Sequence, residues 1–164
     1  MTTHYVTEKQ LSAAMRKEAR KAPALLHRAA VRAAHRGKAR LVAATDEKGI
    51  TDMGQYKNSF KVERGPKGEP AVLFNDSPHA GIIELGARPH PVSAAGLKAL
   101  AEWALRKLDV KDEREAMRVA KAIARKLAKE GQKGRFVFAE NQELLGRYFR
   151  EEFERLLRSD RGKA

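Results

Sequence analysis

A long run of helical periodicity near the start of the chain is the feature that most limits the fold. Within residues 8–43, apolar side chains recur every three or four positions, which places them on one face of a helix. They are Leu11, Ala14, Met15, Ala22, Leu25, Leu26, Ala29 and Ala33. Pro23 interrupts the pattern, because proline lacks an N–H and its ring clashes with the preceding turn. We therefore expect one kinked helix or two successive helices over residues 8–44.

Residues 52–91 have a different character and predict a small antiparallel sheet. Strands are expected at 55–63, 71–75 and 81–85, where β-branched and aromatic residues gather between turn-forming residues. The segment 65–70 is rich in glycine and proline, so it predicts a hairpin between the first two strands.

Helices return over residues 93–158. Ser93 is a candidate N-cap for the first of them. Asp112, with Glu115 three residues later, has the pattern of a capping box that opens the second. Gly131 is placed to end that helix, because glycine readily adopts the left-handed conformation of a C-terminal cap.

The end of the chain completes the predicted order of elements. A short extended segment is expected at 135–138, a last helix at about 140–157 and a frayed tail at 159–164. The order is helix, hairpin, strand and then three helices. It predicts one α+β domain over residues 1–164, in which a small antiparallel sheet of about three to four strands packs against the long N-terminal helix and the C-terminal helices.

The charge of the chain narrows the choice of partners. It holds 34 lysines and arginines against 21 aspartates and glutamates, a net charge of +13. The excess lies in residues 1–44 and 97–164, and the middle is nearly neutral. A charge of this size favours nucleic acid or acidic protein surfaces as partners. No apolar run resembles a membrane span or a signal peptide, so we expect a soluble, unexported protein without a membrane partner.

Catalytic and metal-binding motifs are absent from the sequence. The lack of cysteine excludes disulfides, thiolate metal sites and cysteine nucleophiles. His79, Glu84 and His90 are the metal candidates, but their spacing follows no known ligand pattern. Glu84 and His90 are also candidates for acid–base catalysis, but the sequence shows no group of further catalytic residues to act with them. We therefore expect no enzymatic activity, no cofactor and no metal.

Two groups of residues are candidates for binding a partner. Arg16, Arg20, Arg28 and Arg32 in the first helix are candidate contacts for DNA or an acidic partner, although a solvated helix face has the same composition. The second group lies in a stiff, proline-containing loop after residue 83, which either presents side chains to a partner or only connects two elements. Its candidate residues are Glu84, Gly86, Arg88, Pro89 and His90.

The aromatic residues of the C-terminal helices are expected in the core. Trp103, Tyr148, Phe149 and Phe153 recur at helical spacing, which favours a packed stripe over a ligand pocket. If they cluster on an exposed face, they would instead mark a contact between subunits.

Four segments in order resemble a bacteriophage protein family. Residues 52–60 (DMGQYKNSF) resemble its D-T-G-x-L-x-x-S-I pattern at the start of the first strand, and residues 84–91 (ELGARPHP) resemble its E-x-G-T-R-P-H pattern. Residues 99–103 (ALAEW) are similar to a helix of its longer members, and residues 133–138 (KGRFVF) stand where it has a Pro-Phe segment. Over residues 8–157 the chain therefore resembles the minor tail-component or neck proteins of long-tailed phages, which complete the tail or join it to the head.

The resemblance implies a structural role in the virion, after assembly in the cytoplasm of the bacterial host. Members of the family form rings of identical subunits around the DNA channel and bridge the connector and tail proteins. Met53 and Ala87 depart from the pattern, because the family has threonine at both places, and the prolines around Phe136 are missing. The alternative prediction, based on charge alone, is a basic nucleic-acid-binding module.

Overall fold

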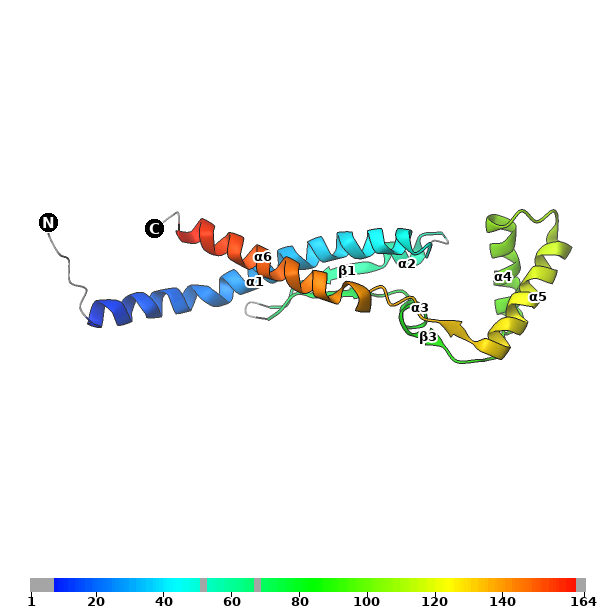
Figure 1. Ribbon diagram of the computed structural model, residues 1–164, viewed down its shortest axis with the longest axis horizontal. Coiled ribbons are helices and arrows are strands. Elements are labelled where there is room, and N and C mark those ends of the chain that lie inside the picture. Colours follow the sequence, from blue (N-terminus) through cyan, green and yellow to red (C-terminus); the bar gives the residue numbers. More distant parts are fainter. Residues whose placement is uncertain (1–7, 51–52, 67–68, 162–164) are drawn as a thin grey trace. The chain divides into compact units, whose positions relative to one another are not determined.

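The computed structural model describes residues 8–50, 53–66 and 69–161 (Figure 1). The fold is α+β, as predicted, and mostly helical. The chain divides into two compact units, the first made of residues 1–43, 60–75 and 141–164 and the second of residues 44–59 and 76–140. Compact units of one chain can belong to one domain or to two, so the single domain stays a prediction.

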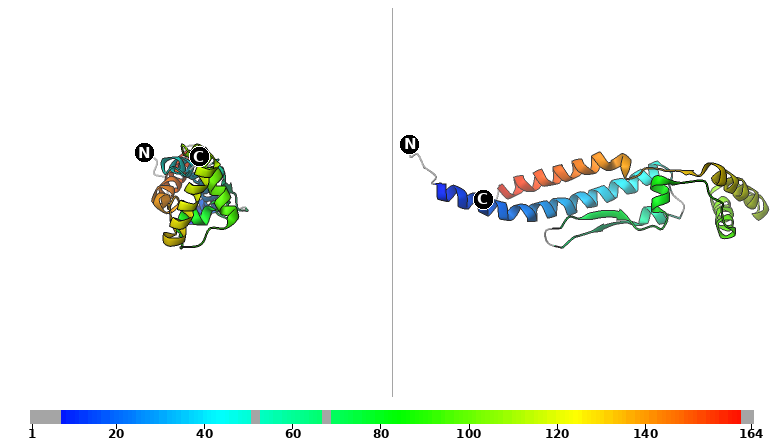
Figure 2. Two further views of the ribbon diagram at one scale, coloured as in Figure 1. Left: turned by 90° about the vertical axis from the view of Figure 1, so that its right-hand side faces the viewer. Right: turned by 90° about the horizontal axis from the view of Figure 1, so that it is seen from below.

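The first unit is built around the long helix α1 (Glu8–Glu47), whose last turn belongs to the second unit. The strands β1 (Phe60–Glu63) and β2 (Val72–Asn75) pair antiparallel, with Phe60 opposite Asn75. Helix α6 (Gln142–Arg161) and this hairpin lie along opposite sides of α1 (Figure 2, right). The unit is therefore a layered arrangement with α1 in its middle.

Large side chains join α1 to α6. Leu25 and Ala29 of α1 are buried with Leu156 of α6. Phe149 and Phe153 pack against this cluster, with stacked rings whose centroids are 6.3 Å apart. Phe149 and Phe153 of α6 thus pack against the core, as predicted.

Gly37 lets both neighbours of α1 approach it closely. A Cβ built on Gly37 would lie 2.7 Å from Cδ2 of Leu145 in α6 and 3.0 Å from Cδ2 of Leu73 in β2. Glycine weakens a helix by about 1 kcal/mol relative to alanine. Here it also provides the space in which α6 and the hairpin both reach α1.

Helix α1 continues through Pro23, so the alternative of two successive helices is wrong. Proline removes one hydrogen bond from the helix, and the ring of Pro23 is exposed, so it displaces nothing in the core. Directly after it, Leu25 and Ala29 are buried, and this packing holds the helix on the far side of the proline.

The second unit contains the other elements. They are α2 (Gln55–Asn58), α3 (Ala80–Leu85), β3 (Gly86–Ala87), α4 (Ala94–Lys107), α5 (Glu113–Glu130) and β4 (Gln132–Lys133), followed by the 3-10 turn η1 (Ala139–Asn141) at its border with the first unit. Strands β3 and β4 pair antiparallel. The described strands thus form two separate two-stranded sheets, whereas the sequence predicted one sheet of three to four strands.

Alanines form the contact between α4 and α5. Ala104, Ala116 and Ala120 have no exposed surface, and Trp103 packs against this cluster. The predicted caps are confirmed, because Ser93 Oγ accepts a hydrogen bond from Gly96 N (3.1 Å) and Asp112 Oδ1 accepts one from Glu115 N (2.8 Å). Gly131 ends α5 with φ 71°, also as predicted.

Two predicted strands are partly or wholly helical. Residues 55–58 form α2 because Gly54, at φ 72°, starts a turn in which its carbonyl accepts from Asn58 N (2.8 Å). Residues 81–85 form part of α3, which follows a turn in which Ser77 O accepts from Ala80 N (2.9 Å). A short apolar run has too few residues to distinguish a strand from a helical turn, and the preceding turns decide it here.

The C-terminal segments also differ from the prediction. Residues 135–138 are not a strand, because Phe136 adopts φ 49° and breaks the extended path. Helix α6 extends to Arg161, so residues 159–161 are helical rather than frayed; residues 162–164 lie outside the described part. An ion pair between Asp160 and Lys21 of α1, 3.3 Å long, supports this last turn. None of the described helices has both the length and the hydropathy required to cross a bilayer.

Candidate partner-binding site

Glu84 binds backbone groups of its own chain. Its Oε1 accepts hydrogen bonds from Phe138 N and Ala139 N, both 3.0 Å long, and its Oε2 lies 3.1 Å from Phe138 N. The first N–H groups of a helical turn have no partner within that turn, and they carry partial positive charge. The Glu84 carboxylate therefore caps the beginning of η1, while its predicted contact with a partner stays a prediction.

Three of the segments that carry the phage resemblance meet at Glu84. The backbone of 135–136 donates hydrogen bonds to the last carbonyls of α3, from Arg135 N to Ile83 O (2.7 Å) and from Phe136 N to Glu84 O (3.2 Å). Tyr56, from the first segment, is buried; burial, together with the nearby charge of Glu84, raises its pKa to about 12. Asp52, the first residue of that segment's motif, lies outside the described residues.

Three glycines allow two antiparallel backbone segments, 84–87 and 131–134, to lie in direct contact. A Cβ on Gly86 would lie 2.3 Å from Gln132 O, one on Gly131 would lie 2.2 Å from Ala87 O, and one on Gly134 would lie 2.5 Å from Glu84 O. These distances leave no room for any side chain. Gly86 and Gly131 also have φ values of 81° and 71°, which favour glycine. We call Gly86, Gly131 and Gly134 the glycine contact.

The other candidates in this loop face solvent. Arg88, Pro89 and His90 are all exposed, and His90 Nδ1 lies 2.8 Å from Arg88 O. No described residue forms an ion pair with Arg88. The five residues predicted to bind a partner thus divide in two: Glu84 and Gly86 hold the chain together, and Arg88, Pro89 and His90 are accessible.

Large apolar side chains are exposed on the same segments. The exposed fractions are 78% for Met53, 74% for Leu85 and 45% for Phe136. None of these three residues was among the candidates for binding a partner that the sequence indicated. A helix as short as α3 has too few residues for periodicity to reveal which apolar side chain stays outside, and the exposure of Phe136 depends on pairing with a distant segment.

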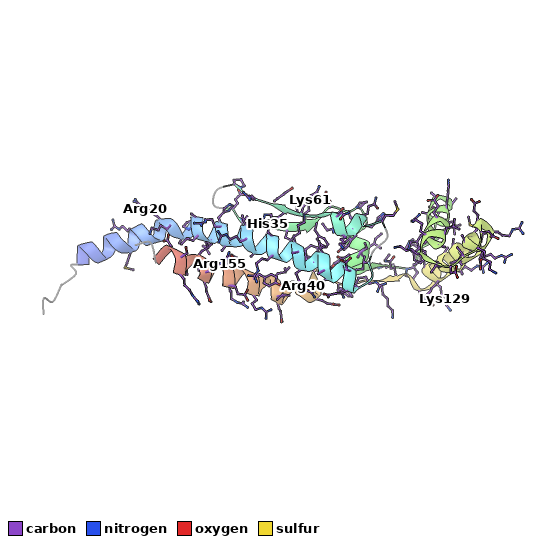
Figure 3. The ribbon with its side chains drawn as sticks, turned by 90° about the horizontal axis from the view of Figure 1, so that it is seen from above. Arg20, His35, Arg40, Lys61, Lys129 and Arg155 are labelled. Atoms are coloured by element: carbon purple, nitrogen blue, oxygen red, sulfur yellow. The ribbon has the colours of Figure 1, made fainter. Side chains whose placement is uncertain are left out.

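The four arginines proposed for α1 do not share one face. Arg16, Arg20, Arg28 and Arg32 are exposed (Figure 3 labels Arg20), but at 100° per residue Arg16 and Arg32 lie about 160° apart around the helix. They therefore do not form a single row that could follow one polyanion.

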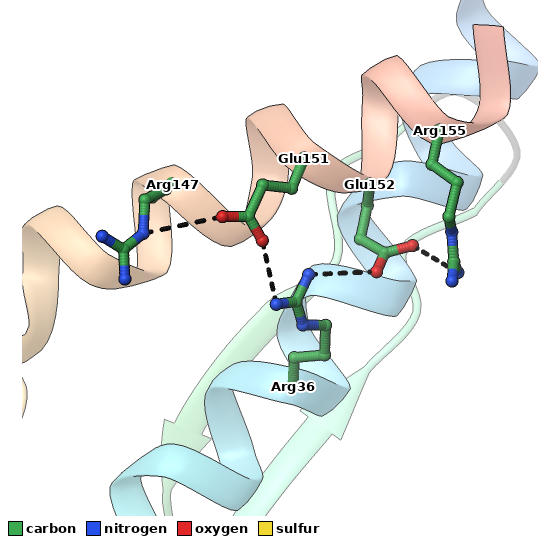
Figure 4. Close-up of polar contacts among 5 residues, drawn as sticks. All are labelled: Arg36, Arg147, Glu151, Glu152 and Arg155. Carbon is green, nitrogen blue, oxygen red and sulfur yellow. Dashed lines mark hydrogen bonds and ion pairs between the residues drawn. The ribbon is translucent and has the colours of Figure 1, made fainter. Parts of the chain in front are cut away.

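Arg36, also on α1, is neutralised by α6. Its Nη2 lies 2.9 Å from Glu151 and its Nη1 3.2 Å from Glu152, whose side chain is only 5% exposed (Figure 4). Arg147 and Arg155 pair with the same two carboxylates. The hydrogen bond to Glu151 is the largest contribution raising the pKa of Arg36, and its guanidinium also lies over the Tyr148 ring at 4.2 Å. This network joins α1 to α6, and each of its three arginines is paired with a carboxylate.

Among the described residues, no group of three or more histidines, aspartates or glutamates is placed to hold a metal ion. Comparison of the chain with protein-family models found no match, and comparisons with curated proteins and with solved structures found none either. The function is therefore inferred from the residues and their geometry.

Proposed function

We propose that this protein is a structural component of the head–tail junction of a long-tailed phage, in the neck or in tail completion. In this role it forms a ring with other copies, bridges the connector and tail proteins in the virion, and catalyses no reaction. The observation that carries the proposal is the meeting of three resembling segments, 53–60, 84–91 and 133–138, at Glu84. Residues far apart in the sequence would thus serve one local structure.

The surface around this meeting point has the composition of a subunit contact. Met53, Leu85 and Phe136, one on each of the three segments, expose large apolar side chains, which together would form an apolar patch of the kind that marks a protein interaction site. Arg88 and His90 add exposed polar groups on the segment that carries Leu85, as in the rim of an interface. In a ring, such a surface would contact a different surface of the next copy.

Loss of the protein from a phage that encodes it tests the proposed role. Particles made without the chain should show heads and tails that fail to join, or tails of incomplete structure, in electron microscopy. Normal, tailed and infectious particles would exclude the proposal.

A pair of matched variants tests the proposed contact. Leu85→Ser removes an apolar side chain that is 74% exposed, and Val72→Ser does the same on the β1–β2 hairpin, where Val72 is 50% exposed. Both variants should keep the helical circular dichroism of the parent, and only Leu85→Ser should fail to restore infectivity. If both variants restore infectivity equally well, this surface is not the contact between subunits.

The alternative function, a basic nucleic-acid-binding module centred on α1, has less support. Arg16 and Arg32 lie on different sides of the helix, and Arg36 is engaged by two glutamates. A gel-shift titration in which Arg16→Gln with Arg20→Gln removes binding would restore this alternative.

A further inference from the structure

One face of α5 carries a continuous row of positive charge. Its members, which we call the α5 stripe, are Arg114, Arg118, Lys121, Arg125 and Lys129. Their spacing of three or four residues places them within about 80° of arc on an ideal helix, over about 22 Å of its length. All five are exposed, and no acidic residue occurs between Glu115 and Glu130.

The packing of α5 directs the stripe away from α4. Ala116 and Ala120 are fully buried in the contact with α4, and helical geometry puts them on the face roughly opposite the stripe. Side chains of this helix, Lys129 among them, project outward in Figure 3. The stripe is therefore available to a partner.

No charge within the described chain balances the stripe. None of its five members forms an ion pair with a described residue, in contrast to Arg36 of α1, which two glutamates of α6 hold. Like charges one helical turn apart destabilise a helix. A row of five such charges without a counter-charge is therefore better suited to binding an external polyanion than to supporting the fold.

We propose that the α5 stripe binds the phosphate backbone of duplex DNA without reading its sequence. Duplex DNA carries one negative charge about every 1.7 Å along its axis, so a row of 22 Å meets many phosphates. Helix α5 contains no aromatic residue, so it offers no platform for stacking the bases of a single strand. It also contains no asparagine or glutamine, the side chains that bind the edge of adenine.

An acidic protein is a weaker candidate for this surface. The centre of a protein interface is usually apolar and poor in lysine. The stripe contains only cations, and the exposed residues beside it on α5 include Ala122 and Lys126 rather than large apolar groups.

Binding of DNA by the stripe does not depend on the proposed head–tail role, because it concerns a different surface and can be measured with purified protein.

Fluorescence anisotropy with the full chain and a labelled 30-base-pair duplex tests the proposal. Each phosphate contact contributes about −0.9 to the slope of log K against log salt, so five contacts predict a slope of about −4.5. The triple variant Arg118→Gln, Lys121→Gln, Arg125→Gln should reduce the magnitude of this slope by about 2.7, to about −1.8, and weaken binding on the order of 100-fold at 0.1 M salt. Glutamine preserves helix propensity, and circular dichroism checks that the variant is folded.

A control with the same change in net charge separates the stripe from the overall charge. Arg16→Gln, Arg28→Gln, Arg32→Gln removes three exposed cations from α1. This control should bind duplex DNA within about threefold of the parent. Equal losses of affinity in both triple variants would mean that net charge alone controls the binding, and would overturn the proposal. The proposal would also be overturned if the parent did not bind duplex DNA, or if the stripe variant bound it as tightly as the parent.

Two competitors test the nature of the partner. A single strand of the same length and polyglutamate of equal total charge are each added to the complex with the duplex. The duplex should resist both at equal charge concentration. Displacement by polyglutamate would assign the stripe to an acidic protein, and tighter binding of the single strand would exclude the duplex; either result overturns the proposal.

Discussion

The two helix pairs of this protein are held together in opposite ways. Helices α1 and α6 meet through large side chains, Leu25, Phe153 and Leu156 among them, and through the carboxylates that bind Arg36. Helices α4 and α5 meet through alanines, of which Ala104 and Ala120 have no exposed surface. Glutamates of α6 pair with Arg36 of α1, whereas no described residue forms an ion pair with the basic row on the outer face of α5. Both α1 and α5 are rich in basic residues, but Arg36 of α1 is paired across its helix contact, and the five cations of the α5 stripe have no ion pair among the described residues.

The largest effect is expected from removing a large side chain from the first pair. Leu156→Ala should lower the free energy of unfolding by about 3 kcal/mol, because Leu156 is 4% exposed and its loss leaves a cavity against Leu25 and Ala29. Chemical denaturation followed by circular dichroism measures it. Trp103, the single tryptophan, packs in the second pair and reports it by fluorescence. An equal shift in both signals would show that the two pairs unfold together.

The second pair should be sensitive to added volume instead. Ala120→Leu places a larger side chain in a contact without free surface and should cost about 2 kcal/mol. Ala122→Leu, at an exposed position of the same helix, is the matched control and should change stability by less than about 0.5 kcal/mol. Denaturation followed by Trp103 fluorescence compares them. Tolerance of leucine at position 120 would contradict the close alanine contact.

The ion pairs of the first pair should contribute unequally. Glu152→Gln should destabilise by about 1 to 2 kcal/mol, because this carboxylate is 5% exposed and its charge serves both Arg36 and Arg155. Glu151→Gln, whose side chain is 46% exposed, should cost less than about 1 kcal/mol. Thermal or urea denaturation at low and high salt measures both. A larger loss of stability for Glu151→Gln than for Glu152→Gln would mean that burial does not decide the strength of these ion pairs.

The smallest effect is expected to be stabilising. Arg118→Glu turns two repulsive pairs, with Arg114 and Lys121, into attractive ones and one attractive spacing, with Glu115, into a repulsive one, so α5 should gain about 0.5 kcal/mol. The same change should weaken binding to duplex DNA, which would show that the stripe is kept at a cost to stability. Urea denaturation in low salt measures the gain. A loss of stability would mean that the stripe is balanced by contacts other than those described.

The sequence predicted correctly those features that depend on contacts between residues close together in the chain. Ser93, Asp112 and Gly131 cap helices through hydrogen bonds or backbone angles within a few residues, and the structure confirms all three. The prediction failed for α2 and for α3, which are too short for periodicity and depend on the turn before them. The candidate site was foreseen in part: Arg88 and His90 are exposed, but the capping contacts of Glu84 join residues 54 and 55 positions apart. The alignment of charges on α5 was present in the sequence spacing alone.

The glycine contact has a consequence for how the chain could change in length. Ala87 pairs with Gln132, so the chain leaves for α4 and returns from α5 at neighbouring points of one ladder. A two-residue turn is enough to close an antiparallel pair of this kind. Helices α4 and α5 are therefore an insertion that begins and ends at one place, and a shorter chain in which a two-residue turn replaces residues 88–131 could close over the same two strands.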